Sequence, residues 1–106
     1  MATFVLIHGS WHGGWCWDGV VKGLAAKGVP AVAPTLTGLA ERAKELSFEV
    51  TLATHVADVV KAAEGFERVV LVGHSYAGLV ITQAVDALGA KVERLVYLDA
   101  FLPAVG

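Results

Sequence analysis

The feature of this sequence that most constrains its fold is the stretch from Val69 to Val85. It begins with an unbroken apolar run, Val69–Val72, which is typical of a strand buried on both faces of a sheet. The turn-like segment Gly73–Gly78 follows, and the apolar segment Leu79–Val85 then predicts a helix. The stretch therefore predicts a strand, a tight turn and a helix, with Ser75 at the apex of the turn.

Ser75 has the sequence setting of a catalytic nucleophile. A serine hydroxyl is a weak nucleophile, so it has to stand clear of the backbone, where we expect a strained, positive φ. The helix behind the turn directs backbone N–H groups toward a developing oxyanion. The motif departs from Gly-x-Ser-x-Gly at Ala77, where a small residue replaces the second glycine. The alternative is that Ser75 only caps the helix after a core strand.

Composition and charge exclude several classes of protein. Of the 106 residues, 56% are hydrophobic and 17% are charged, which excludes a disordered chain and favours a sheet covered on both faces. The net charge of -2 and the lack of a basic cluster argue against a nucleic-acid partner. No apolar run has the length of a membrane span, and the N-terminus lacks a signal-peptide pattern. With the single cysteine, Cys16, these features predict a cytoplasmic protein without an internal disulfide.

The order of predicted elements defines an α/β fold class. Strands alternate with helices along the chain: a strand at Thr3–Ile7, a helix capped by Asp18 and stopped by Gly28, a strand at Val29–Ala33, a helix capped by Thr51 and ended by Gly65, the strand and helix around Ser75 with the helix closing at Gly89, and a strand at Glu93–Asp99. This alternation predicts parallel βαβ units with right-handed crossovers. We expect a three-layer α/β/α domain with a four-stranded, doubly wound sheet in the order 2-1-3-4.

Two sequence features converge on one edge of this predicted sheet. In doubly wound sheets the site lies beyond the carboxyl ends of the strands, near the switch between the first and third strands. The first strand runs into the glycine-rich loop His8-Gly9-Ser10, and the third runs into Ser75-Tyr76. The sequence therefore predicts a functional site between these two turns.

The chain resembles the N-terminal half of an α/β-hydrolase. It is most similar to the branch that holds plant hydroxynitrile lyases, methyl-salicylate-type esterases and related bacterial carboxylesterases. The segments that carry the resemblance occur in the family's order over nearly the whole chain: Phe4–Trp17, Pro34–Leu39, Thr54–Val59, Gly73–Gly78 and Tyr97–Pro103. The resemblance implies half of an α/β-hydrolase fold, one truncated domain over residues 1–106 without the cap and the C-terminal strands.

The resemblance also assigns roles to individual positions. Ser75 matches the nucleophile, and the backbone N–H of Tyr76 matches one oxyanion donor. The backbone N–H of Ser10, just past His8-Gly9, matches the other donor. No cofactor and no metal are implied.

The sequence lacks the rest of the family's triad. The triad partners follow the serine in the order acid, then histidine. After Ser75 the chain has Asp86, Glu93 and Asp99 but no histidine. The candidates that remain are His12 as a base, in the glycine-rich loop, and Asp99 as an acid, at the end of the last strand, although a structural role for Asp99 is the simpler interpretation.

The other histidines have structural interpretations. His74 directly precedes the nucleophile, so its side chain is expected to point away from that of Ser75. His8 shapes the loop in the family, and His55 is expected to be half-buried on its helix. Among the aromatic side chains, Trp15 and Trp17 are expected to pack a helix against the sheet and Trp11 to line the site. Cys16 lies too close to these packing positions to be proposed as a reactive thiol.

Two classes of function follow from these patterns. The first is a serine carboxylesterase acting on small esters, with weak activity because the base is missing. The second is an inactive half-fold or scaffold that pairs with a second copy as a homodimer, or with a complementing C-terminal half. A flavodoxin-like nucleotide-binding module is a third possibility, but the loop after the first strand lacks Gly-x-Gly-x-x-Gly.

Overall fold

The computed structural model describes residues 2–9, 12–39, 42 and 50–100. The strands are β1 (Thr3–Ile7), β2 (Ala31–Val32), β3 (Val69–His74) and β4 (Val92–Leu98), and the helices are α1 (Asp18–Ala26), α2 (Leu52–Ala63) and α3 (Ala77–Leu88). Two short 3-10 helices, η1 (Gly14–Trp17) and η3 (Gly89–Lys91), precede α1 and β4. No helix in these ranges is long and apolar enough to cross a membrane.

The four strands form one parallel sheet in the order β2-β1-β3-β4, which confirms the predicted topology. In the centre of the sheet, Val5 of β1 pairs with Leu71 of β3. Beside them, β4 pairs with β3 up to His74 and Leu98, with one register shift between Val69 and Val70. Because all strands are parallel, their carboxyl ends meet at one edge.

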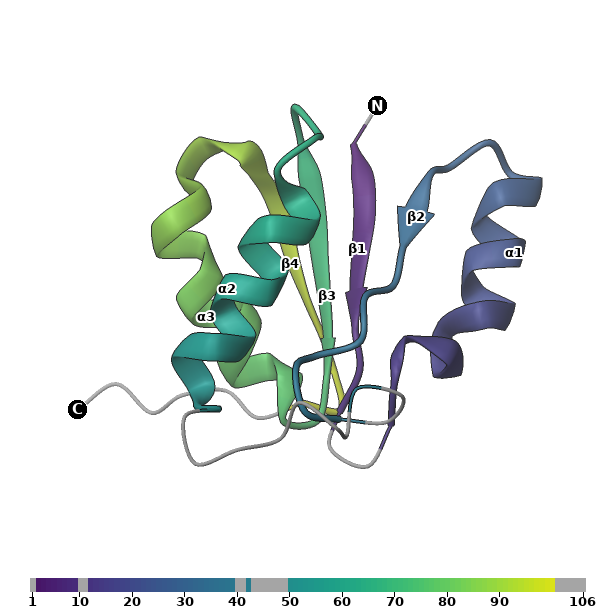
Figure 1. The fold of residues 1–106 in the computed structure, drawn as a ribbon. Coiled ribbons are helices and arrows are strands. Elements are labelled where there is room, and N and C mark those ends of the chain that lie inside the picture. The colour runs from purple at the N-terminus through teal and green to yellow at the C-terminus, as the bar shows by residue number, and fades with distance from the viewer. Residues whose placement is uncertain (1, 10–11, 40–41, 43–49, 101–106) are drawn as a thin grey trace.

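Figure 1 shows the three layers: α2 and α3 cover one face of the sheet, and α1 lies on the other. The α2/α3 face holds the larger core, in which buried residues of β1, β3, α2 and α3 pack together. Val5, Leu71 and Ile81 are fully buried there. The period-two pattern of the strands explains this, since alternate side chains of β1 and β3 point to the same face.

The face of the sheet under α1 is covered less completely than the hydrophobic content of the sequence predicts. Its core is a small cluster of Leu6, Trp17, Val70 and Val72, and no residue of α1 itself is fully buried. The expectation that Trp15 packs a helix against the sheet is wrong: its side chain is 56% exposed, whereas Trp17 is buried. Cys16, next to Trp15 in the chain, is exposed as well.

The predicted helix ends are largely correct. Thr51 caps α2 in a capping box with Thr54, and positive φ at Gly28 and Gly89 follows the ends of α1 and α3. Asp18 is not the N-cap that we expected, because η1 precedes α1 directly and Trp17 takes the cap position. Strand β2 is shorter than predicted, since only Ala31 and Val32 pair with β1.

Candidate functional site

The turn between β3 and α3 has the geometry expected of a strand–turn–helix apex. Ser75 has φ of 56°, in the left-handed region that side-chain-bearing residues rarely adopt, so the predicted positive φ is confirmed. The amide N–H groups of Gly78 and Leu79 donate to the carbonyls of Ser75 and Tyr76, each at 3.0 Å, and close the first turn of α3. Ser75 is half-buried, so solvent reaches it.

Small residues allow the strand and the helix to cross closely at this turn. A Cβ added at Gly73 would lie 2.9 Å from the carbonyl oxygen of Ala77 and from Cδ1 of Ile81. Ala77 itself is fully buried, so its methyl group is accommodated where the family pattern has a second glycine. The departure from Gly-x-Ser-x-Gly therefore leaves the local geometry intact.

The loop after β1 passes directly beside the turn. A Cβ at Gly9 would lie 3.1 Å from both the Cβ of Ser75 and the carbonyl oxygen of His74. The loop after β1 and the turn at Ser75 therefore meet at Gly9, as the sequence predicts. The predicted oxyanion residue Ser10 and the predicted site-lining residue Trp11 lie outside the described residues.

His8 ties this loop to the segment after β2. Its ring is fully buried, and Nε2 accepts a hydrogen bond from the Leu36 amide N–H at 3.0 Å. An imidazole that accepts at Nε2 carries its proton on Nδ1, which therefore donates to the Gly9 carbonyl at 2.7 Å. His8 thus shapes the loop, as the resemblance implied. The neighbouring Gly14 amide donates to Thr35 Oγ1 at 2.9 Å and adds a second tie.

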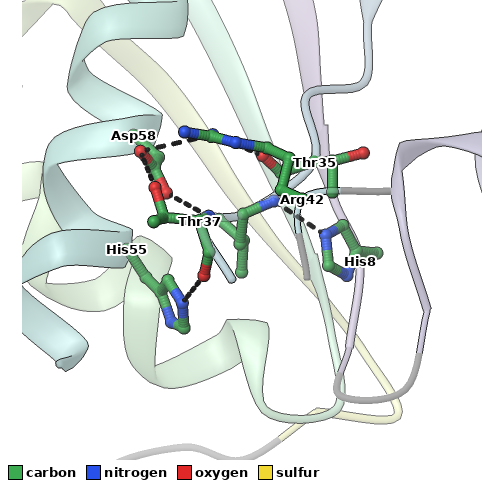
Figure 2. Close-up of polar contacts among 7 residues, drawn as sticks. His8, Thr35, Thr37, Arg42, His55 and Asp58 are labelled. Carbon is green, nitrogen blue, oxygen red and sulfur yellow. Dashed lines mark hydrogen bonds and ion pairs between the residues drawn. The ribbon is translucent and has the colours of Figure 1, made fainter. Parts of the chain in front are cut away.

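A chain of hydrogen bonds joins α2 to the segment after β2 (Figure 2) and to the turn at Tyr76. The Nε2 atom of His55 lies 2.9 Å from the Thr37 carbonyl oxygen. Its Nδ1 atom lies 2.8 Å from the Tyr76 hydroxyl. Asp58, one turn along α2, accepts from the backbone N–H and the hydroxyl of Thr37 at 2.7 and 2.9 Å. Arg42 lies 3.7 Å from the Asp58 carboxylate.

His55 is the residue that sequence reasoning underestimated. It was expected to be half-buried without a specific role, but its side chain is buried and both ring nitrogens have partners. The one available signal was its three-residue spacing from Asp58 on a helix whose same face is otherwise apolar.

Two histidines line a cavity on the α1 side of the sheet. The cavity has a volume of about 240 Å³ and is lined by His12, Cys16, Trp17, Val20, His74 and Leu98. The rings of His12 and His74 lie 6.2 Å apart, and the Nδ1 atom of His12 is buried without a hydrogen-bond partner among the described residues. Although Cys16 is exposed overall, partial desolvation of its thiol, reinforced by the Asp18 carboxylate, raises the pKa of that thiol.

No histidine forms a hydrogen bond to Ser75 in the part of the chain that the structure describes, which includes all four histidines. Asp99 follows β4 directly, is exposed, and has φ of 48°. It lies at the same edge of the sheet as Ser75, because the preceding residues Leu98 and His74 are paired. Within the described ranges, no group of three or more His, Cys, Asp or Glu side chains is placed to hold a metal ion.

The fold and the turn define the class of protein. The sequence matches the model of the alpha/beta hydrolase family over residues 4–106, and the chain belongs to that family. It is 48% identical to a carbendazim hydrolyzing esterase of Nocardioides, an alignment that covers 100% of this chain and 45% of the relative. It is 40% identical to a probable esterase of rice, with 97% and 40% covered.

Solved structures agree with this assignment. An extracellular alpha/beta-hydrolase from Paenibacillus superimposes with a TM-score of 0.88 at 30% identity, over 100% of this chain and 43% of that chain. A methylesterase from Arabidopsis superimposes with a TM-score of 0.89 at 27% identity, over 100% and 46%. The chain thus spans less than half the length of these relatives and matches part of the α/β-hydrolase fold.

Proposed function

We propose that this chain carries the nucleophile half of a serine carboxylesterase for small esters, with Ser75 as the nucleophile. The observation that carries the proposal is the strained φ of Ser75 at a half-buried turn between β3 and α3, directly beside the loop at Gly9. Strained backbone of this kind persists where the surrounding structure holds it, and it concentrates at functional sites. The esterase names of the relatives support the same chemistry.

The proposed oxyanion donors are the backbone N–H groups of Tyr76 and Ser10. Tyr76 stands at the N-terminus of α3, where the first amide groups of a helix have no partner within the helix. Ser10 follows Gly9, whose carbonyl is held by His8. Loss of one such donor typically costs about 3–4 kcal/mol of transition-state stabilisation. Because both donors are backbone groups, side-chain substitutions do not remove them.

The proposed reaction proceeds through an acyl-enzyme. The Ser75 oxygen bonds to the ester carbonyl carbon and loses its proton to a base. The tetrahedral intermediate then breaks its bond to the alkoxy oxygen, which takes up that proton and departs as the alcohol. Water hydrolyses the acyl-enzyme and returns the proton to Ser75. Because no histidine bonds to Ser75 among the described residues, we expect solvent to serve as the base and turnover to be weak. His12 and Asp99 are the secondary candidates for base and acid.

A second candidate function is a half-fold that assembles with another chain. The observation that favours it is the position of β4 at the end of the strand order, with Val96 and Leu98 exposed by 38% and 51%. An apolar edge strand of this kind invites pairing with another strand. We propose a homodimer through β4, with a complementing C-terminal half as the alternative occupant.

Hydrolysis of p-nitrophenyl acetate separates the two functions. Wild type is compared with Ser75→Ala and with Ser47→Ala, a matched serine replacement elsewhere in the sequence. The esterase proposal predicts a burst or slow turnover in wild type and in Ser47→Ala that is lost in Ser75→Ala. Equal rates in all three proteins would reject Ser75 as the nucleophile and leave the assembly function.

A further inference from the structure

The side chain of Tyr76 links the turn at Ser75 to helix α2. Tyr76 is the single residue between Ser75 and the first residue of α3, so its orientation is tied to the amide that follows the proposed nucleophile. Its hydroxyl lies 2.8 Å from Nδ1 of His55, and the two rings meet edge to face at 5.6 Å. Residue 76 is therefore held by a side chain from a different element.

The direction of each hydrogen bond follows from chemistry. A carbonyl oxygen only accepts, so the contact between His55 Nε2 and the Thr37 carbonyl requires a proton on Nε2. In the neutral ring Nδ1 then has a lone pair, which accepts from the Tyr76 hydroxyl. Burial raises the pKa of Tyr76, so the phenol remains a donor throughout the neutral range.

The partner of His55 is itself fixed in place. Thr37 presents its carbonyl to His55, while its N–H and hydroxyl both donate to Asp58. His55 and Asp58 are one helical turn apart on α2, so one face of this helix contacts the N–H, the hydroxyl and the carbonyl of Thr37 (Figure 2). The hydrogen bond to Thr37 therefore fixes Nε2 of the imidazole, and Nδ1 faces the Tyr76 hydroxyl.

We propose that His55 is a positioning residue that acts through Tyr76 to fix the Ser75–Tyr76 segment in its strained conformation. The catalytic part of this inference, the positioning of Ser75 as a nucleophile, rests on the proposed function. The structural part, the restraint on the backbone of Ser75 and Tyr76, does not. Ser75 with positive φ relaxes toward ordinary backbone unless neighbouring groups prevent it. The hydrogen bond from Tyr76 to His55 supplies such a restraint within one residue of the strain.

Hydrogen exchange tests the restraint without any need for catalysis. The reporters are the amides of Gly78 and Leu79, which donate to the carbonyls of Ser75 and Tyr76, and the reference amides are those of Leu71 and Val72 in β3. Removing the hydrogen bond with Tyr76→Phe or His55→Leu is expected to raise exchange at the reporters about tenfold relative to the reference.

Two further variants make this result specific. Lys91→Met is the control, because the Lys91 ammonium donates to the carbonyls of Ala63 and Glu64 at the far end of α2, and its loss is expected to leave the reporters unchanged. His55→Gln retains an acceptor and a donor and is expected to restore slow exchange. Unchanged reporters in Tyr76→Phe and His55→Leu would overturn the proposal, and so would an equal rise at the reference amides.

Labelling of Ser75 by a fluorophosphonate probe tests the catalytic meaning. Misplacement of a reacting group reduces its rate, and we expect about a tenfold fall in the maximal labelling rate of Tyr76→Phe and His55→Leu, with unchanged probe affinity. The double variant is expected to match the single ones, because both remove the same contact. If the losses in labelling rate added up in the double variant, or if both single variants were labelled at the wild-type rate, the proposal that His55 and Tyr76 position Ser75 would be overturned. Absence of labelling in wild type would instead reject the proposed function, and hydrogen exchange would then decide the inference alone.

Discussion

The face of the sheet under α2 and α3 and the face under α1 differ in how completely they are packed. On the first, buried residues from strands and helices form one continuous core. On the second, the buried cluster is small, and α1 contributes no fully buried side chain. The candidate site lies at the end of the sheet, and its specific hydrogen bonds come from both the well-packed helix α2 and the loop after β1. The comparison indicates that the buried core lies mainly on one face, and α2 on that face also supplies the hydrogen bond to Tyr76 beside the strained turn.

A matched pair of leucine truncations gives the largest expected effect. Leu71 and Leu6 are both buried residues of neighbouring central strands, but Leu71 faces α2 and α3 while Leu6 faces α1. We expect Leu71→Ala to lower the free energy of unfolding by about 4 kcal/mol and Leu6→Ala by about 2.5 kcal/mol, because the incomplete face relaxes around the cavity. Denaturant unfolding measures both values, and equal losses would contradict the comparison.

A second pair compares the loop and the helix on the α1 side. A Cβ at Gly14 would lie 2.1 Å from the Ala33 carbonyl oxygen, whereas one at Gly19 in α1 meets nothing within 4 Å. We expect Gly14→Ala to cost about 3 kcal/mol, since backbone has to move, and Gly19→Ala to gain about 0.5–1 kcal/mol from helix propensity. A tolerated Gly14→Ala would show that the loop is not fixed against the segment after β2.

The fold was predictable because its signals are local. Strands alternate with helices, Thr51 begins a helix with a capping box, and Gly28 and Gly89 follow helix ends with positive φ. The turn at Ser75 was predictable for the same reason, as an apolar strand, a tight turn and a helix follow one another within one segment. Each of these signals needs no knowledge of distant contacts.

The remaining features depend on distant partners. The pattern of α1 is amphipathic, yet Val20 is 44% exposed. The residues of a helix do not determine which other elements pack against its apolar face. His55 bonds to Thr37 and Tyr76, which are 18 and 21 residues away in opposite directions along the chain. Only the tertiary fold brings these three groups together, so the sequence did not indicate them.

The cap of α2 gives the next smaller effect. Thr51 accepts a hydrogen bond from the Thr54 amide, while the N-cap of α1, Trp17, makes no side-chain cap bond. We expect Thr51→Ala to lower the free energy of unfolding by about 1 kcal/mol. Thr51→Ser is the control and is expected to retain most of the stability. A neutral Thr51→Ala would show that packing alone sets the start of α2.

Relief of the strain at Ser75 is expected to stabilise the protein. Glycine adopts positive φ without the steric cost that serine has, so Ser75→Gly is expected to gain up to about 1 kcal/mol, while Ser75→Ala stays near wild type. Both variants are expected to lose hydrolysis of p-nitrophenyl acetate. Thermal unfolding of the three proteins measures the gain. A destabilised Ser75→Gly would mean that the serine hydroxyl, rather than backbone conformation, matters to the fold.

The smallest expected change in folding stability comes at the incompletely covered face. Leu98 ends β4, is 51% exposed and lines the cavity beside α1. Leu98→Lys removes no core contact, so its free energy of unfolding is expected to stay within about 0.5 kcal/mol of wild type.

If the proposed dimer forms through β4, the charge added by Leu98→Lys opposes pairing of the edge and shifts sedimentation toward the 11.1 kDa monomer. Ala57→Lys, which adds the same charge at an exposed position of α2, is the matched control and is expected to sediment as wild type does. Identical sedimentation of wild type and Leu98→Lys would exclude this edge as the dimer interface, even with the fold unchanged.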